Sequence, residues 1–302
     1  MADGQRTYKD RLFSFIFGNE EHREWTLSLY NAVNGSHYTD PSLLTITTIR
    51  DVLYMGMHND LSFLVYDVMS LYEQQSSFNP NAPLRMLQYA GNLYEKYVTG
   101  RKLNKYGTHL IELPVPKLVV FYNSAQDKPD RMELRLSDSF PEGMRGEADI
   151  EVRVRMVNVN RGRSAALLDS CRPLWEYAYI VDKVRSLRAY GSLGEAIDRM
   201  IEELPEDFTL RPWLREHRAE VKGMLLTEYN ETEQMELFRE EGRAEGRAEG
   251  EAKGRAEGRA KGEAIVTKLL ETLFALGRTD DAHRAIVDEA YRRQLYAEFG
   301  LD

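Results

Sequence analysis

The chain has 302 residues, a formal net charge of -9 and a hydrophobic content of 42%. This length allows one or two domains with a real core, and the composition excludes a disordered chain. A single cysteine, Cys171, excludes an intramolecular disulfide and a cysteine-rich zinc site, and it fits a reducing cytoplasm. No signal peptide and no run of 18 apolar residues is visible, so we expect a cytoplasmic protein without a membrane partner.

The hydrophobic pattern of the first 163 residues predicts strands mixed with helices. Two helices are expected over residues 7–34, on either side of Gly18–Asn19. Alternating or apolar runs predict strands at 43–49, 52–57, 61–66, 68–75, 115–122 and 151–159. A helix over 83–97 is expected to turn one apolar face to the core, formed by Leu84, Leu87, Gly91, Tyr94 and Val98.

After residue 164 the pattern predicts helices alone, including a capping box of Ser192 with Glu195. From Gly242 to Gly262 a glycine recurs every four residues, and each costs a helix about 1 kcal/mol relative to alanine. Two alternatives stay open for this segment: a flexible charged linker, or a helix supported by close packing along its glycines, as in a dimer. The predicted organisation is a core, a helical region, the repeat and a small C-terminal helical unit, at 1–163, 164–240, 241–263 and 264–302.

One group of polar residues interrupts the apolar strands of the core. Asp60 precedes one apolar run, and Glu73 and Gln75 stand two apart at the end of the next. Side chains two apart on a strand share a face, and a hairpin partner would bring Asp60 beside them. Carboxylates in such a cluster suit Mg²⁺, although acids at strand ends also occur simply because they face water.

Longer stretches of the sequence resemble the Rpn family of recombination-promoting nucleases, also described as PD-(D/E)XK-type putative transposases. The resemblance covers roughly residues 6–262, and its specific segments are YKDRLFSFIFG, SLYNAVNG, NDLSFLV, LYEQQSSFNPNAPLRMLQYAGNLYEKYV, LPVPKLVVFYNS, DKPDRMELRLSDSF and LREHRAEVKGMLLTEYN. It implies an α/β fold with a PD-(D/E)XK (restriction-endonuclease-like) core. In this core a mixed sheet is flanked by helices, and an α-helical C-terminal region follows.

The resemblance also implies roles for the polar cluster. Asp60 and Glu73 would be catalytic acids that hold Mg²⁺, or alternatively Mn²⁺, and the metal would activate water against a phosphodiester bond. Gln75 stands where the family of folds commonly has a lysine, and glutamine cannot stabilise hydroxide with a charge. Lys96, on the following helix, is a candidate for supplying that charge.

Four arginines are candidates for contacts with DNA phosphates: Arg153, Arg155, Arg161 and Arg163. The first two are expected to share a strand face, and the alternative is a solvated face with no partner. The sequence as a whole predicts a Mg²⁺-dependent DNA endonuclease linked to recombination or mobile elements. The rival interpretation, favoured by Gln75 and by the acidic net charge, is a catalytically weak DNA-binding or oligomeric interaction protein that associates through its C-terminal helices.

Overall fold

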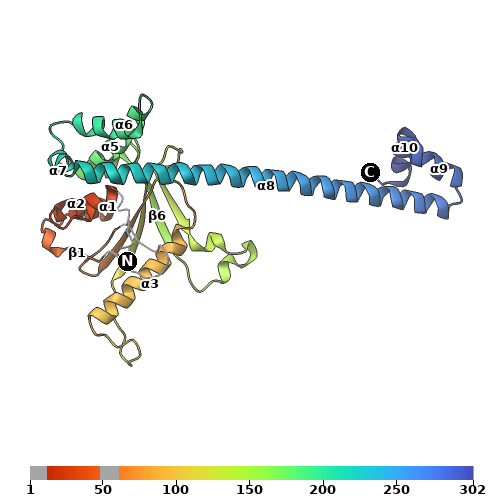
Figure 1. Cartoon of the computed structure of the whole chain (residues 1–302). Helices are drawn as coiled ribbons and strands as arrows, with labels where there is room; N and C mark the ends of the chain where they lie inside the picture. Colours follow the sequence, from red (N-terminus) through yellow and green to blue (C-terminus); the bar gives the residue numbers. More distant parts are fainter. Residues whose placement is uncertain (1–11, 48–60, 302) are drawn as a thin grey trace, which may run out of the picture. The chain divides into compact units, whose positions relative to one another are not determined.

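The computed structural model describes residues 12–47 and 61–301, which form an α/β fold with a mixed six-stranded sheet (Figure 1). The strand order is β1-β2-β3-β4-β6-β5. The strands are β1 (Thr45–Ile46), β2 (Leu61–Val65), β3 (Val68–Gln75), β4 (Val115–Tyr122), β5 (Arg131–Arg135) and β6 (Arg153–Asn158). The expected strand at 52–57 lies outside the described residues.

Strands β1, β2 and β3 form an antiparallel meander, in which Leu61 pairs with Tyr72. Helix α3 (Ala82–Gly100) then carries the chain back, so that β4 pairs parallel to β3 and β6 parallel to β4. The carboxyl ends of β3, β4 and β6 therefore lie at one edge of the sheet. Open α/β sheets commonly bind ligands at such an edge.

The two faces of the sheet are covered by different helices (Figure 1). Met69 and Leu71 of β3 pack on the α3 side, while Tyr72 packs on the opposite side. This alternation follows from the two-residue period of a strand. The helices with buried residues on the opposite side are α1 (Leu12–Phe17), α2 (Arg23–Asn34), α4 (Ala165–Ser170), α5 (Arg172–Arg188), α6 (Leu193–Glu202), α7 (Arg211–Glu216) and the first turns of α8 (Arg218–Ala275).

The predicted apolar face of α3 is only partly right. Leu87 and Tyr94 pack against the core, but Leu84 is 48% exposed, and the most buried residues of the helix are Met86, Tyr89 and Leu93. Helix α3 carries two overlapping apolar stripes at helical spacing, and the sheet packs against the one that begins at Ala82. Because the sheet packs mainly against this stripe and not the predicted one, the polar residues in the first turn of α3 lie elsewhere relative to the strand ends than the predicted face implies.

Other local predictions agree with the structure or fall short of it. The Ser192–Glu195 capping box is confirmed, and Gly35 ends α2 in a left-handed conformation with φ of 66°. Strand β1 begins two residues later than expected because residues Pro41–Leu43 form a 3₁₀ turn, and the last two residues of the expected strand, 48 and 49, lie outside the described residues. Strand β5, which forms one edge of the sheet, was not predicted.

The chain divides into two compact units, Met1–Glu233 and Gln234–Asp302. Helix α8 (Arg218–Ala275) is continuous through the glycine repeat. In the second unit α8 is followed by α9 (Thr279–Val287) and α10 (Glu289–Phe299), around a small core of Leu269, Leu273, Ala282, Ala285 and Leu295. None of the described helices combines the length and apolarity that a bilayer crossing requires.

Candidate active site

Two of the predicted site residues, Glu73 and Gln75, lie at the carboxyl end of β3. Both are buried, and both project to the α3 side of the sheet because they alternate in phase with Met69 and Leu71. Their partners in β4 are Val120 and Tyr122. Glu73 therefore stands within the sheet rather than at a solvated strand end, which is the placement expected of a functional carboxylate.

The carboxylate of Glu73 is held through one of its two oxygens. Gln75 Nε2 donates a hydrogen bond to Glu73 Oε1 over 2.9 Å, and Arg85 in the first turn of α3 forms an ion pair with the same oxygen. Gln75 is held in turn, since its Oε1 accepts from the backbone N–H of Asn79 at 3.4 Å. Gln75 thus orients Glu73, while Arg85 supplies the positive charge beside it.

The second oxygen of the Glu73 carboxylate has no such partner in the described part of the chain. Glu73 Oε2 is buried and has no hydrogen-bond partner among the described residues. A buried anionic oxygen without a partner is costly, and a bound cation is one way to satisfy it. The donor chemistry of Glu73 therefore fits a divalent metal ion.

The other predicted metal ligand, Asp60, lies outside the described residues. The register puts the first residue of β2, Leu61, opposite Tyr72, which is the neighbour of Glu73. Within residues 12–47 and 61–301, no cluster of three His, Cys, Asp or Glu side chains is arranged to hold a metal. The described part of the candidate site contributes one carboxylate, and the sequence analysis assigns the second to Asp60.

The same edge of the sheet carries several amides that the sequence analysis did not single out. Arg185 of α5 donates to Asn160 Oδ1 at 2.8 Å and to the carbonyl of Asn123 at 2.6 Å. Asn160 in turn donates to Asn158 Oδ1 at 2.8 Å. These bonds tie the ends of β4 and β6 to α5, and the signal for them was present in the asparagines that end or follow these apolar strands.

Asn123 is the least satisfied of these amides. Its side chain is 1% exposed, and neither Oδ1 nor Nδ2 has a partner in the described ranges. Leaving such a group unpaired costs about 1–3 kcal/mol. A buried polar group without a partner calls for an explanation, such as an ordered water, an ion or a functional role.

Arg153 and Arg155 share a face of β6, as predicted, but it is the face opposite Glu73. Val154 and Met156 pack on the α3 side, so the arginines between them project to the other side. Neither arginine forms an ion pair with a described residue. Arg155 lines a cavity of about 310 Å³ together with Arg131, Glu133 and mainly apolar side chains.

Arg161 and Arg163 lie in the loop after β6 and are paired with carboxylates. Arg161 Nη1 is 3.5 Å from Asp182 Oδ2. Arg163 contacts Asp127 and lies 3.6 Å from Asp130 Oδ1. These ion pairs offset the charge that a phosphate would recognise, so Arg161 and Arg163 are weaker candidates for DNA contacts than Arg153 and Arg155.

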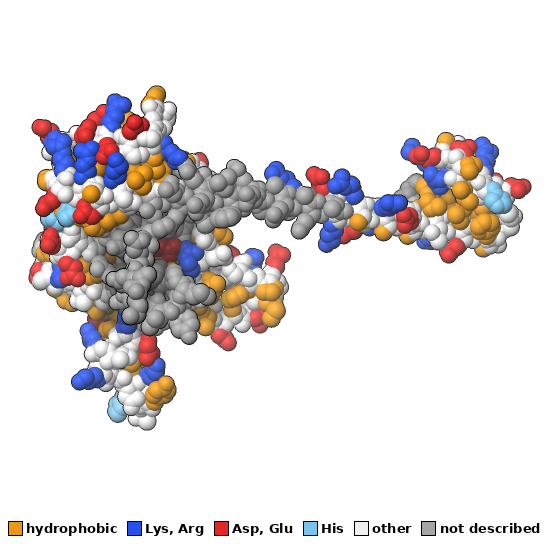
Figure 2. Space-filling view, in the orientation of Figure 1, with side chains coloured by type: hydrophobic (Ala, Val, Ile, Leu, Met, Phe, Trp, Pro, Cys, Tyr) orange, Lys and Arg blue, Asp and Glu red, His pale blue; other side chains and the backbone are white. Residues whose placement is uncertain are grey.

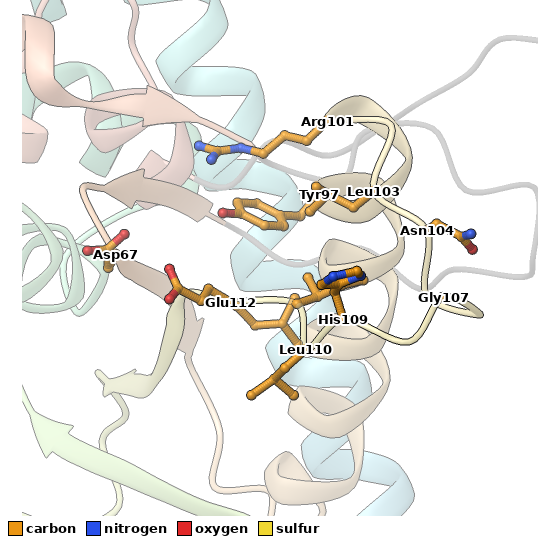
Figure 3. A pocket seen from close by; sticks show the side chains of 11 residues that line it. Asp67, Tyr97, Arg101, Leu103, Asn104, Gly107, His109, Leu110 and Glu112 are labelled. Atoms are coloured by element: carbon orange, nitrogen blue, oxygen red, sulfur yellow. The ribbon is translucent and has the colours of Figure 1, made fainter.

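A larger cavity, of about 810 Å³, lies at the other end of β3 (Figure 3). Figure 3 shows Tyr97 and Arg101 at the end of α3, the loop that follows them, and Asp67 from the turn before β3. Asp67 precedes Glu73 by six residues, which corresponds to roughly 20 Å along a strand. This cavity is therefore separate from the Glu73 cluster.

Comparison of the chain with protein-family models, with curated proteins and with solved structures finds no match in any of the three.

Proposed function

We propose that the chain is a metal-dependent DNA endonuclease of the Rpn type, with a PD-(D/E)XK core formed by the sheet and α3. The observation that carries this proposal is the buried carboxylate of Glu73, which has one oxygen held by Gln75 and Arg85 and the other without a described partner. If Glu73 had no functional role, its carboxylate would be expected to be exposed to water or to have hydrogen-bond partners for both oxygens, or another residue would occupy this position.

Glu73 and Asp60 would hold the metal, Mg²⁺ or Mn²⁺. When bound, such an ion offsets charge on a scissile phosphate and promotes attack by water. Gln75 holds Glu73 Oε1 in place, so that Oε2 remains directed away from the pair formed with Arg85. Hydrogen bonds that orient a metal ligand typically affect metal affinity or activity by about 10–100-fold.

In this proposal, DNA is also contacted by basic residues on the face of the sheet opposite Glu73. Arg153 and Arg155 share their sheet face with Arg131 and Arg135 of β5, and Glu133 is the acid between them. Because this face is opposite Glu73, these arginines would contact a part of the nucleic acid distant from the cleaved bond. Basic residues gathered on one face can provide such contacts despite the acidic net charge.

The proposal is tested by incubating the purified full chain with supercoiled plasmid, with Mg²⁺ or with EDTA. Conversion to nicked or linear DNA is expected only with the metal, and Asp60→Ala is expected to abolish it, since that change removes a proposed ligand. Metal-independent cleavage, or full activity of the Asp60→Ala protein, would remove the metal site from the proposal.

A specific observation favours a second function, self-association through the C-terminal unit. The C-terminal unit carries a group of hydrophobic side chains on the face shown in Figure 2. The exposed large apolar side chains of this unit are Phe274, Leu276, Ile286 and Val287. The glycines from Gly246 to Gly262 have no atoms within 4 Å of an added Cβ, so their stripe on α8 is open to another helix. The flanking charges, such as Arg259 with Glu263 at 3.2 Å, pair along α8 itself.

Light scattering tests self-association directly. The full chain is expected to have a mass at least twice that of one chain, which is 34.9 kDa. Replacing Ile286 and Val287 together by serine should lower this mass, since both side chains are more than half exposed in one copy of the chain. Arg293→Ser, an exposed change on α10, is the matched control and should leave the mass unchanged. A monomeric parent protein would refute this second function.

A further inference from the structure

The positive charge beside Glu73 comes from a helix and not from the strand. Gln75, two residues after Glu73, is uncharged, so β3 itself supplies no cation at this point. Arg85 in α3 fills this place, and its ion pair with Glu73 is mostly shielded from water. The side chain of Arg85 is 27% exposed and that of Glu73 10%.

The geometry of α3 explains why Arg85 reaches the site. The helix begins at Ala82, directly after the loop that leaves β3, so its first turn lies at the carboxyl edge of the strands. Lys96, the cation considered from the sequence, is eleven residues further along the same helix. At 1.5 Å per residue it lies about 16 Å from Arg85 along the helix axis, well beyond the reach of its own side chain. Of these two residues, Arg85 is therefore the one that places a positive charge beside Glu73.

The guanidinium of Arg85 retains free hydrogen-bonding capacity. It uses Nη2 for Glu73, and among the described residues its side chain has no other hydrogen-bond partner. Arginine has five N–H donors in a planar fork that matches the oxygens of a phosphate. The guanidinium of Arg85 is partly exposed, and the buried carboxylate of Glu73 fixes one of its nitrogens. Its remaining N–H groups can therefore bind an anion that approaches from the solvent.

We propose that Arg85 is a catalytic residue that contacts the phosphate of the nucleic acid strand at the Glu73 site and replaces the charge that Gln75 lacks. This inference rests on the proposed nuclease function for its catalytic part only. Its binding part is a phosphate contact made by Arg85. This part can be tested in a protein that does not cleave DNA, so it does not depend on the nuclease function.

The catalytic part is tested by nicking rates at saturating Mg²⁺. Arg85→Gln is expected to lower the rate about 10²–10³-fold, as loss of one donor to a developing negative charge does. Arg85→Lys, which keeps the charge but loses the fork, should show an intermediate loss. Adding Gln75→Lys to Arg85→Gln returns a charge from the strand and should restore the rate at least about 10-fold. Because a lysine at position 75 would also pair with Glu73, the rescue shows that a positive charge is needed at this place, and the salt dependence of DNA binding distinguishes a phosphate contact from a purely structural ion pair. Lys96→Gln, on the exposed surface of the same helix, is the matched control.

The binding part is tested without cleavage, by fluorescence anisotropy of a labelled DNA duplex in EDTA over a series of salt concentrations. Arg85→Gln should reduce the slope of log affinity against log salt by about one, whereas Lys96→Gln should leave it unchanged. Circular dichroism establishes that each variant is folded, and Arg85→Lys retains the ion pair if Arg85→Gln does not fold.

The outcomes separate the two proposals. If the parent cuts DNA and folded Arg85→Gln cuts equally well, the catalytic role of Arg85 is refuted and the nuclease stands. If the parent does not cut but Arg85→Gln loses one unit of salt dependence, the nuclease is refuted and the phosphate contact stands. An unchanged rate and an unchanged salt slope in Arg85→Gln overturn the inference completely.

Discussion

Replacing Glu73 by glutamine is expected to reduce Mg²⁺-dependent DNA cleavage by more than about 100-fold, since even the residues that only orient a metal ligand contribute about 10–100-fold. Glutamine keeps the shape of the side chain and keeps an oxygen that can accept from Arg85, but it removes the negative charge. The oxygen that has no described partner, Oε2, would become an amide or an uncharged acceptor, and neither suits a divalent cation. Single-turnover nicking rates measure this loss.

The same substitution is expected to leave the protein folded. Glutamine keeps an acceptor oxygen for Arg85, and Arg85, whose side chain is 27% exposed, can be hydrated when its partner loses charge. Glu112→Gln, on the loop beside the cavity at the opposite end of β3, is the control and should cleave like the parent. Parent-like cleavage by the Glu73→Gln protein would show that Glu73 is not a metal ligand, and the nuclease proposal would lose its central observation.

The strands at the centre of the sheet could be predicted from the sequence because they are apolar and end at strong turn signals. Strands β3 and β4 have the predicted bounds, since Val68–Gln75 and Val115–Tyr122 are continuous runs without an alternative helical reading. Strand β5 was missed because three of its five residues are charged, so its apolar residues Met132 and Leu134 are too few to produce a clear pattern. Its pairing with β6 is a tertiary contact that local sequence does not encode.

The candidate site was predictable in part for a similar reason. The spacing of Glu73 and Gln75 on a strand is local, so their shared face followed from the sequence alone. The position of Arg85 depended on how α3 is turned toward the sheet, and the predicted face was centred on the neighbouring stripe, because Leu84 and Leu87 have the same helical spacing as Met86 and Tyr89. The placement of Arg153 and Arg155 opposite Glu73 required the pairing of β3, β4 and β6, which no single segment contains.

Glu176→Ala is expected to destabilise the N-terminal unit by about 2–6 kcal/mol, because two backbone donors lose their acceptor at about 1–3 kcal/mol each. Glu176 of α5 is fully buried, and its two oxygens accept three hydrogen bonds: from Arg172 Nε at 2.6 Å and from the backbone N–H groups of Thr209 and Leu210, each at 2.8 Å. These bonds fix the segment before α7 to α5. Alanine leaves both backbone donors without an acceptor, and each such loss costs about 1–3 kcal/mol.

Urea unfolding followed by tryptophan fluorescence measures this effect in the full chain, because Trp25, Trp175 and Trp213 all belong to the N-terminal unit. The midpoint should fall while the slope stays unchanged, as expected for a loss of stability without a change in the surface exposed on unfolding. Glu176→Gln should be intermediate, since its amide has one acceptor oxygen for two backbone donors. Asp207→Ala removes only the exposed partner of Arg172 and should cost less than about 1 kcal/mol. If Glu176→Ala unfolds at the same urea concentration as Asp207→Ala, the bonds to Thr209 and Leu210 do not hold this segment, and its attachment to α5 must come from apolar packing instead.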